Sequence, residues 1–172
     1  MFNRIMGVFK LDANTFEAIE SDSSATGQAA IIVAIVALLA SLGSGLSAGL
    51  FGGGNFLVSF ITTLVWTFIG WLLWSVVSYF VGTTFFGGKA TIDEMLRVIG
   101  FAYAPQFLSI IPCVGWIIGG IWSLIAGFIA IRQGLDLDNV KAALTVLVGF
   151  VFFVVGNILV SILLGGVSAL FS

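Results

Sequence analysis

The stretch that decides the fold is residues 27–82, which read GQAAIIVAIVALLASLGSGLSAGLFGGGNFLVSFITTLVWTFIGWLLWSVVSYFVG. It holds two apolar blocks, 27–51 and 56–82, and it contains no Asp, Glu, Lys, Arg or His. A helix needs about 20 apolar residues to cross the hydrocarbon core of a bilayer. Each block exceeds that length, so each is predicted to form a membrane-spanning helix.

Three further apolar blocks follow this stretch, at 98–111, 114–131 and 142–171. The segments outside the blocks are alternately charged and uncharged, and the charged ones hold all six basic side chains: Arg4, Lys10, Lys89, Arg97, Arg132 and Lys141. If every block crosses the bilayer, these side chains all fall on one side, which the positive-inside rule makes the cytoplasm. The predicted fold is an all-α polytopic membrane helix bundle with five transmembrane helices, a cytoplasmic N-terminus and a C-terminus outside.

The composition leaves no room for a soluble module. Hydrophobic residues make up 60% of the chain and charged residues 8%, against about 25% charged residues in a typical soluble domain. The mean hydropathy of +1.22 indicates a surface that faces lipid. We therefore expect residues 27–172 to form one multi-pass domain in the cell membrane, the cytoplasmic or inner membrane of a prokaryote. The net charge of −2 gives no indication of a nucleic-acid partner.

The third block is short, and Pro105 and Pro112 interrupt and end it. Residues 98–131 can make two crossings or a re-entrant hairpin, since both preserve the alternation of charged and uncharged segments. Two crossings are favoured because an amphipathic helix can precede the block and lengthen it. Thr91 and Glu94 have the spacing of a capping box, which predicts the start of that helix, and Pro105 predicts a kink.

Residues 1–26 form a lead-in to the first block. Phe2, Ile5, Met6 and Phe9 recur at helical spacing beside basic residues that can reach lipid headgroups. The segment is predicted to lie on the membrane as a cytoplasmic interfacial anchor. The alternative is a poorly ordered terminus that carries a few apolar residues.

Two blocks carry small residues at four-residue intervals. The first block has Ala37, Ser41, Gly45 and Gly49, and the fourth block has Gly115, Gly119, Ser123 and Gly127. Small residues one turn apart let another helix approach closely, and in lipid this close packing replaces the hydrophobic driving force. The two stripes are candidate helix-packing or partner surfaces, and the partner helix can belong to this chain or to another protein.

Polar and aromatic side chains inside the blocks suggest packing roles. Asn157 and Ser161 share one stripe of the fifth block with Gly165. Asn157 can form a hydrogen bond across a helix interface, worth about 1 kcal/mol, and the alternative is a pore-lining amide. In the second block Trp71 and Trp74 lie deeper than an interfacial belt requires, so we expect them to fill gaps between helices or to face lipid.

The chain lacks the residues of most active sites. It has no His, one cysteine, Cys113, and no charged side chain from residue 27 to residue 88 or from residue 142 to the C-terminus. A metal site, a catalytic triad and the intramembrane charge of an ion-coupled transporter are therefore all unexpected. We expect no enzymatic activity and neither cofactor nor metal ion, with Cys113 serving as a small apolar residue.

Three segments carry a family resemblance: LRVIGFAYAP at 96–105, Ile121-Trp122, and NVKAA at 139–143. They resemble the Yip1 domain family of five-span membrane proteins, and the resemblance implies a cytoplasmic N-terminus. It marks Gly100, Tyr103 and Pro105 as family-motif positions with structural roles. In eukaryotic relatives it would imply binding of prenylated Rab GTPases or membrane shaping. Residues 1–26 lack the Asp-Leu-Tyr-Gly-Pro motif of those relatives, so the chain is more similar to the short prokaryotic members.

These observations favour binding over chemistry. The leading hypothesis is a non-enzymatic integral membrane protein that acts through helix–helix binding, as an adaptor or accessory subunit of a larger membrane assembly. The expected partners are membrane lipids and either other membrane-protein subunits or a second copy of the chain. One alternative is a passive conduit or lipid scramblase that uses a polar groove around Asn157, Ser161 and Pro105. The other is a membrane-shaping homo-oligomer whose wedge is the lead-in.

Overall fold

The computed structural model describes residues 1–51, 54–111 and 114–170, and for residue 153 and residues 156–170 it describes the backbone alone. Every regular element within these ranges is helical, which confirms the all-α prediction for them. The elements are α1 (Phe2–Phe9), α2 (Ala13–Glu20), α3 (Ala25–Phe51), α4 (Phe56–Phe86), α5 (Ile92–Ala102), the 3₁₀ helix η1 (Ala104–Ile110), α6 (Gly115–Gly134) and α7 (Asn139–Leu170). Pro112 and Cys113, for which the sequence made predictions, lie outside the described residues.

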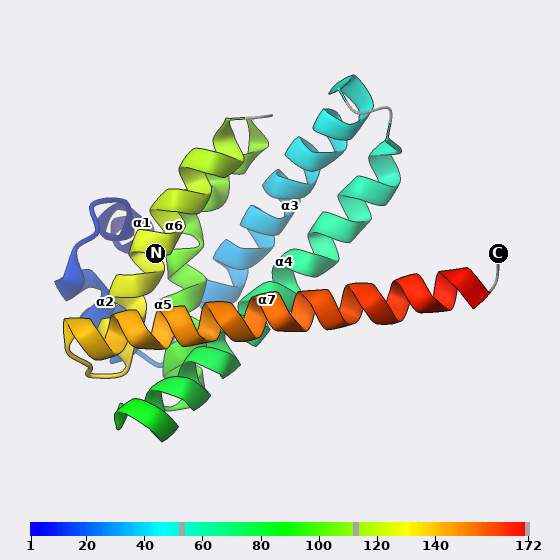
Figure 1. Ribbon diagram of the computed structural model, residues 1–172. Helices are drawn as coiled ribbons and strands as arrows, with labels where there is room; N and C mark the ends of the chain where they lie inside the picture. The colour runs from blue at the N-terminus through cyan, green and yellow to red at the C-terminus, as the bar shows by residue number, and fades with distance from the viewer. Residues whose placement is uncertain (52–53, 112–113, 171–172) are drawn as a thin grey trace.

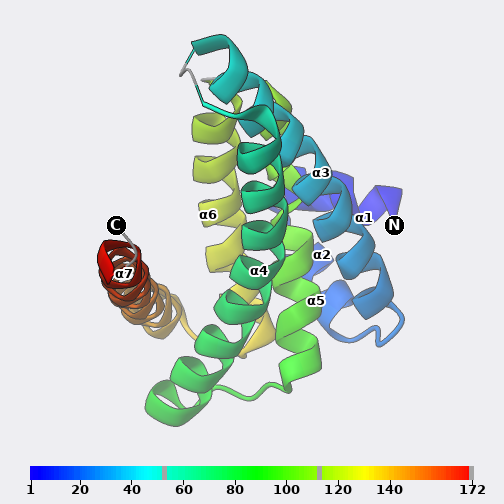
Figure 2. The ribbon, with the colours of Figure 1, turned by 90° about the vertical axis from the view of Figure 1, so that its right-hand side faces the viewer.

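Three of the helices are long and apolar enough to cross a membrane: α3 with 27 residues, α4 with 31 and α6 with 20. They come from the first, second and fourth apolar blocks. α3 and α4 form an antiparallel pair, joined at the uncharged end of the bundle (Figures 1 and 2). Asn55 begins α4, because its side-chain oxygen accepts hydrogen bonds from the free backbone N–H groups of Leu57 and Val58. The count of five spans and the sides of the two termini remain predictions.

The third block lies at the centre of the bundle, as α5 followed by η1; α5 packs on α3, α4 and α6, and η1 packs on α3 and α6. The expected kink takes the form of a change of helix type after Ala102, because the proline at Pro105 cannot donate to an α-helical hydrogen bond. Because a 3₁₀ helix rises about 2.0 Å per residue and an α-helix about 1.5 Å, α5 and η1 together extend about 30 Å. That length includes the charged first turns of α5, with Asp93, Glu94 and Arg97, so the two-crossing interpretation of residues 98–131 remains a prediction.

Two glycines allow the backbone of η1 to lie directly against its neighbours. A Cβ atom on Gly43 of α3 would overlap the carbonyl oxygen of Ser109, and one on Gly115 of α6 would overlap the carbonyl oxygen of Leu108. A 3₁₀ helix of seven residues is longer than usual, since its hydrogen bonds are weaker than those of an α-helix. Contact with glycine backbones on both sides therefore holds η1 in place.

The fifth block forms one continuous helix, α7, which leaves the bundle instead of lying parallel to α3, α4 and α6 (Figure 1). Its first turns pack on α4 and α6, where Ala142 and Thr145 are buried. Phe152 lies two turns after Thr145 on the same face of the helix, yet its side chain is 54% exposed. The bundle therefore covers only the beginning of α7. Hydropathy predicts the helix but carries no information about its direction.

The lead-in is an ordered part of the fold. α1 and α2 pack beside α5 and α6, and Val8, Phe16 and Ile19 are completely buried there. Asp12 begins α2 by accepting a hydrogen bond from the backbone N–H of Asn14. Phe2 remains 72% exposed on α1, which leaves an apolar surface for the predicted contact with the membrane. The structure thus replaces the alternative of a poorly ordered terminus with a docked helix pair.

Candidate functional site

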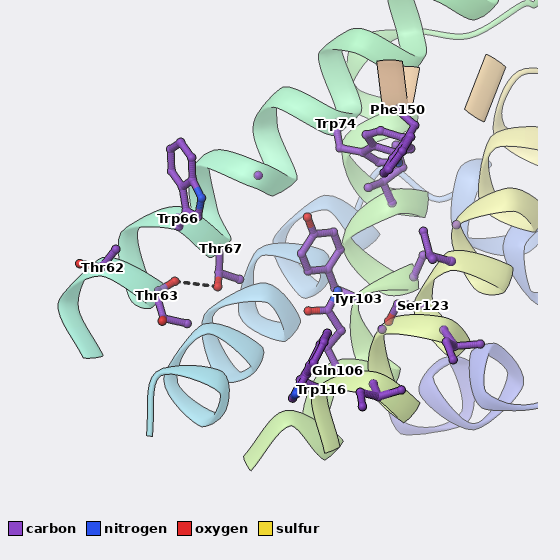
Figure 3. Close-up of a pocket in the computed structure, with 18 residues that line it drawn as sticks. Thr62, Thr63, Trp66, Thr67, Trp74, Tyr103, Gln106, Trp116, Ser123 and Phe150 are labelled. Atoms are coloured by element: carbon purple, nitrogen blue, oxygen red, sulfur yellow. Dashed lines mark hydrogen bonds between the residues drawn. The ribbon is translucent and has the colours of Figure 1, made fainter. Parts of the chain in front are cut away.

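A lateral groove lies between α4 and α6, with the junction of α5 and η1 as its floor and Phe150 of α7 beside Trp74 (Figure 3). Its volume is about 740 Å³, within the range of about 300–1,000 Å³ that is usual for small-molecule sites. Its polar lining residues are Thr62, Thr63, Thr67, Tyr103, Gln106 and Ser123, and three tryptophans, Trp66, Trp74 and Trp116, stand along its walls.

The polar groups of the groove come from three elements. Tyr103 and Gln106 project from the junction of α5 and η1, and Ser123 projects from α6, all toward the α4 wall (Figure 3). The hydroxyl of Thr67 donates to the carbonyl oxygen of Thr63 at 2.8 Å. The Ser123 hydroxyl is buried and has no hydrogen-bond partner among the described residues. No Asp, Glu, Lys or Arg lines the groove, so a charged ligand group would have no counter-charge there.

The stripe in the first block packs mainly within this chain. Ala37, Ser41 and Gly45 are buried, and a Cβ atom on Gly45 would lie 2.7 Å from the ring of Phe56 on α4. The hydroxyl of Ser41 donates to the carbonyl oxygen of Ala37, one turn back. Gly49 is exposed, and a Cβ atom there would meet no atom within 4 Å. The α3–α4 pair therefore uses most of this stripe.

The stripe in the fourth block divides between two roles. Gly115 and Gly119 face η1, and a Cβ atom on Gly119 would lie 2.9 Å from the carbonyl oxygen of Pro105. Ser123 and Gly127 instead line the groove, and a Cβ atom on Gly127 would meet no atom within 4 Å. The close helix approach that the stripe predicts is therefore made with η1 of the same chain.

The three family-motif positions lie together where α5 meets η1. Gly100 allows close packing, since a Cβ atom there would lie 2.7 Å from the Cβ of Ala29 and 3.1 Å from the indole nitrogen of Trp71. That indole nitrogen donates to the carbonyl oxygen of Leu96 at 3.0 Å, so Trp71 fills a gap between α4 and α5 as expected. Pro105 is buried in η1, and Tyr103 lines the groove.

A buried arginine joins the lead-in to the bundle. Arg97 on α5 is only 6% exposed, and its Nε and Nη2 atoms donate to the carbonyl oxygen of Glu20 at 3.0 and 2.7 Å. Its Nη1 donates to the hydroxyl of Thr26, and Glu94 lies 3.7 Å away. Glu20 ends α2, where carbonyl groups lack helical partners and a positive charge is favourable.

Sequence reasoning counted Arg97 as a charge in a connection and did not find this role. Its one signal is the position of Arg97 on the same amphipathic helix as Glu94, which could have suggested a structural pair.

The pKa of the Glu20 carboxyl is raised to about 7. Burial is the main cause, and the negative charges of Glu17, Asp136 and Glu94 add to it, whereas Arg97 opposes it. The Glu20 side chain therefore titrates near neutral pH at the charged end of the bundle.

The side chains of Asn157 and Ser161 lie outside the described side chains, and only their place on the α7 backbone is known. Sequence reasoning also missed Gln106 and Gly120 as groove-lining residues. No signal in the sequence marks them, because the groove depends on how α4 and α6 are spaced.

Comparison with known families matches residues 6–167 of the chain to the Yip1 domain. The matched range includes the second half of α1, all of α2, the central α5–η1 element and nearly all of α7. Neither the curated proteins nor the solved structures contain a significant match to the chain.

Proposed function

This chain belongs to the Yip1 domain family of membrane proteins, and from this membership and the course of α7 we propose that it is a non-enzymatic adaptor or accessory subunit that binds other membrane proteins through its helices. We propose the cell membrane of a prokaryote as its location, because the segment with Phe16 before the first block resembles that of the prokaryotic members. In this arrangement the connections that carry the six basic residues face the cytoplasm.

The observation that carries the proposal is the exposed part of α7. From Phe150 to Val155, every side chain that the structure describes is exposed and apolar. The backbone continues as a helix to Leu170, away from the rest of the chain (Figure 1). A helix that is apolar and lacks contacts within its own chain must be covered by lipid or by a helix of another protein.

The sequence of the far half of α7 favours a protein partner over lipid alone. Asn157, Ser161 and Gly165 recur at four-residue intervals, so they share one face of the helix. Small residues permit a close helix approach, and the Asn amide can hydrogen-bond across the interface. The stripes on α3 and α6 offer less support, because they pack mainly against other parts of this chain.

Native mass spectrometry after gentle detergent extraction from the source membrane tests this proposal. We expect the wild-type chain to carry a defined set of other subunits, and the double variant N157L/S161L to lose them. Val155→Leu is the matched control, because it adds bulk on the other side of α7. A wild-type chain that is a lone monomer or a homo-oligomer, or a double variant that keeps its subunits, would contradict the proposal.

A second candidate, the membrane-shaping homo-oligomer, is favoured by α1. Phe2 and Met6 are exposed on this helix beside Arg4 and Lys10, so it can insert as a shallow wedge. Deleting the lead-in would also remove buried residues from the core, so a point variant is the sharper test. If the wedge acts, F2S/M6S should abolish tubulation of vesicles while the protein stays folded. The conduit or scramblase alternative remains a prediction, and a liposome flux assay in which protein-containing and empty vesicles are equal would remove it.

A further inference from the structure

The groove extends through about half of the bilayer. On α4 its lining runs from Thr62 to Trp74, and on α6 from Trp116 to Gly127. At about 1.5 Å per residue both walls are about 17–18 Å long. Half of a hydrocarbon core of about 30 Å is about 15 Å, so the groove matches the depth of one leaflet. Both helices continue beyond the groove, to Phe86 and Gly134, while the lining residues end at Trp74 and Gly127.

The open half lies on the side of the uncharged connections. Trp116 is in the first turn of α6 and is 64% exposed, and Trp66, which is 45% exposed, stands on the facing wall of α4. Tryptophan favours the boundary between headgroups and hydrocarbon, because its ring is apolar and its N–H is polar. The two side chains therefore mark the rim of the groove, where a lipid headgroup would remain outside (Figure 3).

The chemistry of the walls suits the apolar tail of a lipid and its ester group. No ionisable acid or base of the Asp, Glu, Lys or Arg type lines the groove. At the rim, the hydroxyls of Thr62 and Thr63 and the indole N–H of Trp66 have no hydrogen-bond acceptor among the described residues. These groups can donate to ester carbonyl oxygens, which only accept. Below the rim, Tyr103, Gln106 and Ser123 add polar groups, and the innermost lining, toward Ile99 and Trp74, is apolar.

The groove is wide because several residues of its walls are glycines, which have no side chain. Gly70, Gly120 and Gly127 stand along its walls, and a Cβ atom on Gly120 or Gly127 would meet no atom within 4 Å. Space of this kind between two spans cannot stay empty in a bilayer, because its lining would lose dispersion contacts on one side.

From these observations we propose that the groove between α4 and α6 is a lipid-binding site, which holds one acyl chain of a membrane lipid from the leaflet on the side of the uncharged connections. The headgroup lies outside, the ester region reaches the rim at Thr62, Thr63 and the two tryptophans, and the chain ends near Trp74. The lining ends at about mid-membrane, at Trp74 and Gly127, so the site holds a lipid of one leaflet. This inference does not depend on the adaptor role.

Two glycines allow the groove to be filled without disturbing the packing of the helices. Leucine at Gly120 and Gly127 would occupy the groove, since neither Cβ atom meets a neighbour. Gly49→Leu is the matched control, because Gly49 is also a helical glycine with open space around it but lies on α3, outside the groove. Thermal unfolding of the three proteins in detergent shows whether they are equally folded.

The test is photo-crosslinking of the full chain in phosphatidylcholine vesicles that contain a trace of phosphatidylcholine with a diazirine in its acyl chain. We expect crosslinks on Tyr103, Gln106 and Ile117 to exceed those on lipid-facing residues outside the groove, such as Leu72 and Leu57. In G120L/G127L they should fall about tenfold, which corresponds to about 1.4 kcal/mol of binding, while G49L keeps them. Replacing the headgroup by phosphatidylglycerol should leave the pattern unchanged.

Three results would overturn the proposal. Equal labelling of the groove and the outer faces would show contact with bulk lipid only. An unlabelled groove whose residues crosslink to α7 or to a co-purified protein would assign the groove to a helix. Labelling that persists in the folded double variant would place the acyl chain elsewhere.

Discussion

The charged end of the bundle and its opposite, uncharged half are packed in different ways. At the charged end α2, α3, α5 and α6 enclose Phe16, Met95 and Phe101 completely, and Arg97 joins the lead-in to α5. In the uncharged half α4 and α6 form the walls of the groove, and α7, which begins at the charged end, leaves the bundle (Figure 1). The difference indicates that the fold is stabilised at the charged end, whereas the other half offers surfaces to lipids and partner helices.

The largest loss of stability is expected at Gly115, where α6 packs directly on the backbone of η1. Gly115→Ala places a Cβ atom against the carbonyl oxygen of Leu108, and backbone cannot move aside as a flexible side chain can. We expect a loss of about 3 kcal/mol or more in the free energy of unfolding, measured by thermal or denaturant unfolding in detergent.

Gly49→Ala is the control for this substitution, since its Cβ atom meets nothing. It should leave stability unchanged or raise it by up to about 1 kcal/mol through helix propensity. Equal effects of the two variants would show that η1 can shift, and the division of the bundle into a closed and an open part would then be wrong.

The next largest loss of stability is expected at Arg97, which connects the lead-in to α5. Arg97→Met keeps much of the side-chain volume but leaves the Glu20 carbonyl oxygen without its donors. Hydrogen bonds from a charged group are worth about 1.5–3 kcal/mol, so we expect a loss of about 2–3 kcal/mol and faster proteolysis within residues 21–24. Arg4→Met, which breaks the partly exposed pair with Asp22, should cost about 1 kcal/mol or less. If Arg4→Met lowers the free energy of unfolding as much as Arg97→Met does, the hydrogen bonds of Arg97 do not hold the lead-in to the bundle.

A smaller loss of stability is expected at Trp71, which packs between α4 and α5. Trp71→Phe keeps an aromatic ring beside Gly100 but removes the hydrogen bond to the carbonyl oxygen of Leu96. We expect a loss of about 1 kcal/mol in the free energy of unfolding, since one hydrogen bond is lost while the Leu96 carbonyl keeps its helical partner inside α5. Trp66→Phe, at the exposed rim of the groove, should change stability by less than about 0.5 kcal/mol.

The sequence predicts local features well and three-dimensional relations poorly. The capping box is confirmed, because Thr91 accepts from the N–H of Glu94 and the Glu94 carboxylate accepts from the N–H of Thr91. Such a motif depends on four successive residues, and an apolar block depends on its own composition. The burial of Arg97, by contrast, depends on α2, which is 77 positions away in the chain. The direction of α7 and the groove depend on helix spacing, which hydropathy does not encode.

The smallest effect is a dependence of the free energy of unfolding on pH, which arises from Glu20 at the charged end. The pKa of Glu20 is about 7 in the folded protein and 4.5 as its ordinary value, so between these values the folded state holds a proton that the unfolded chain has released. The free energy of unfolding should therefore fall as pH rises from about 5 to 7 and level off above 7. Because the side chain is partly exposed, solvent screening reduces the total change to about 1 kcal/mol.

Glu20→Gln separates this titration from general effects of pH. The variant should match the wild type at pH 5, exceed its stability by about 1 kcal/mol at pH 8, and show no slope between. Asp93→Asn removes a negative charge from the same end of the bundle but is not among the groups that raise the pKa of Glu20, so its slope should remain. Thermal unfolding of the three proteins across pH 5–8 makes the comparison. If the stability of the wild type did not change between pH 5 and pH 8, the Glu20 carboxyl would be as well hydrated as in the unfolded chain. The packing at the charged end would then not enclose the Glu20 side chain at the end of α2.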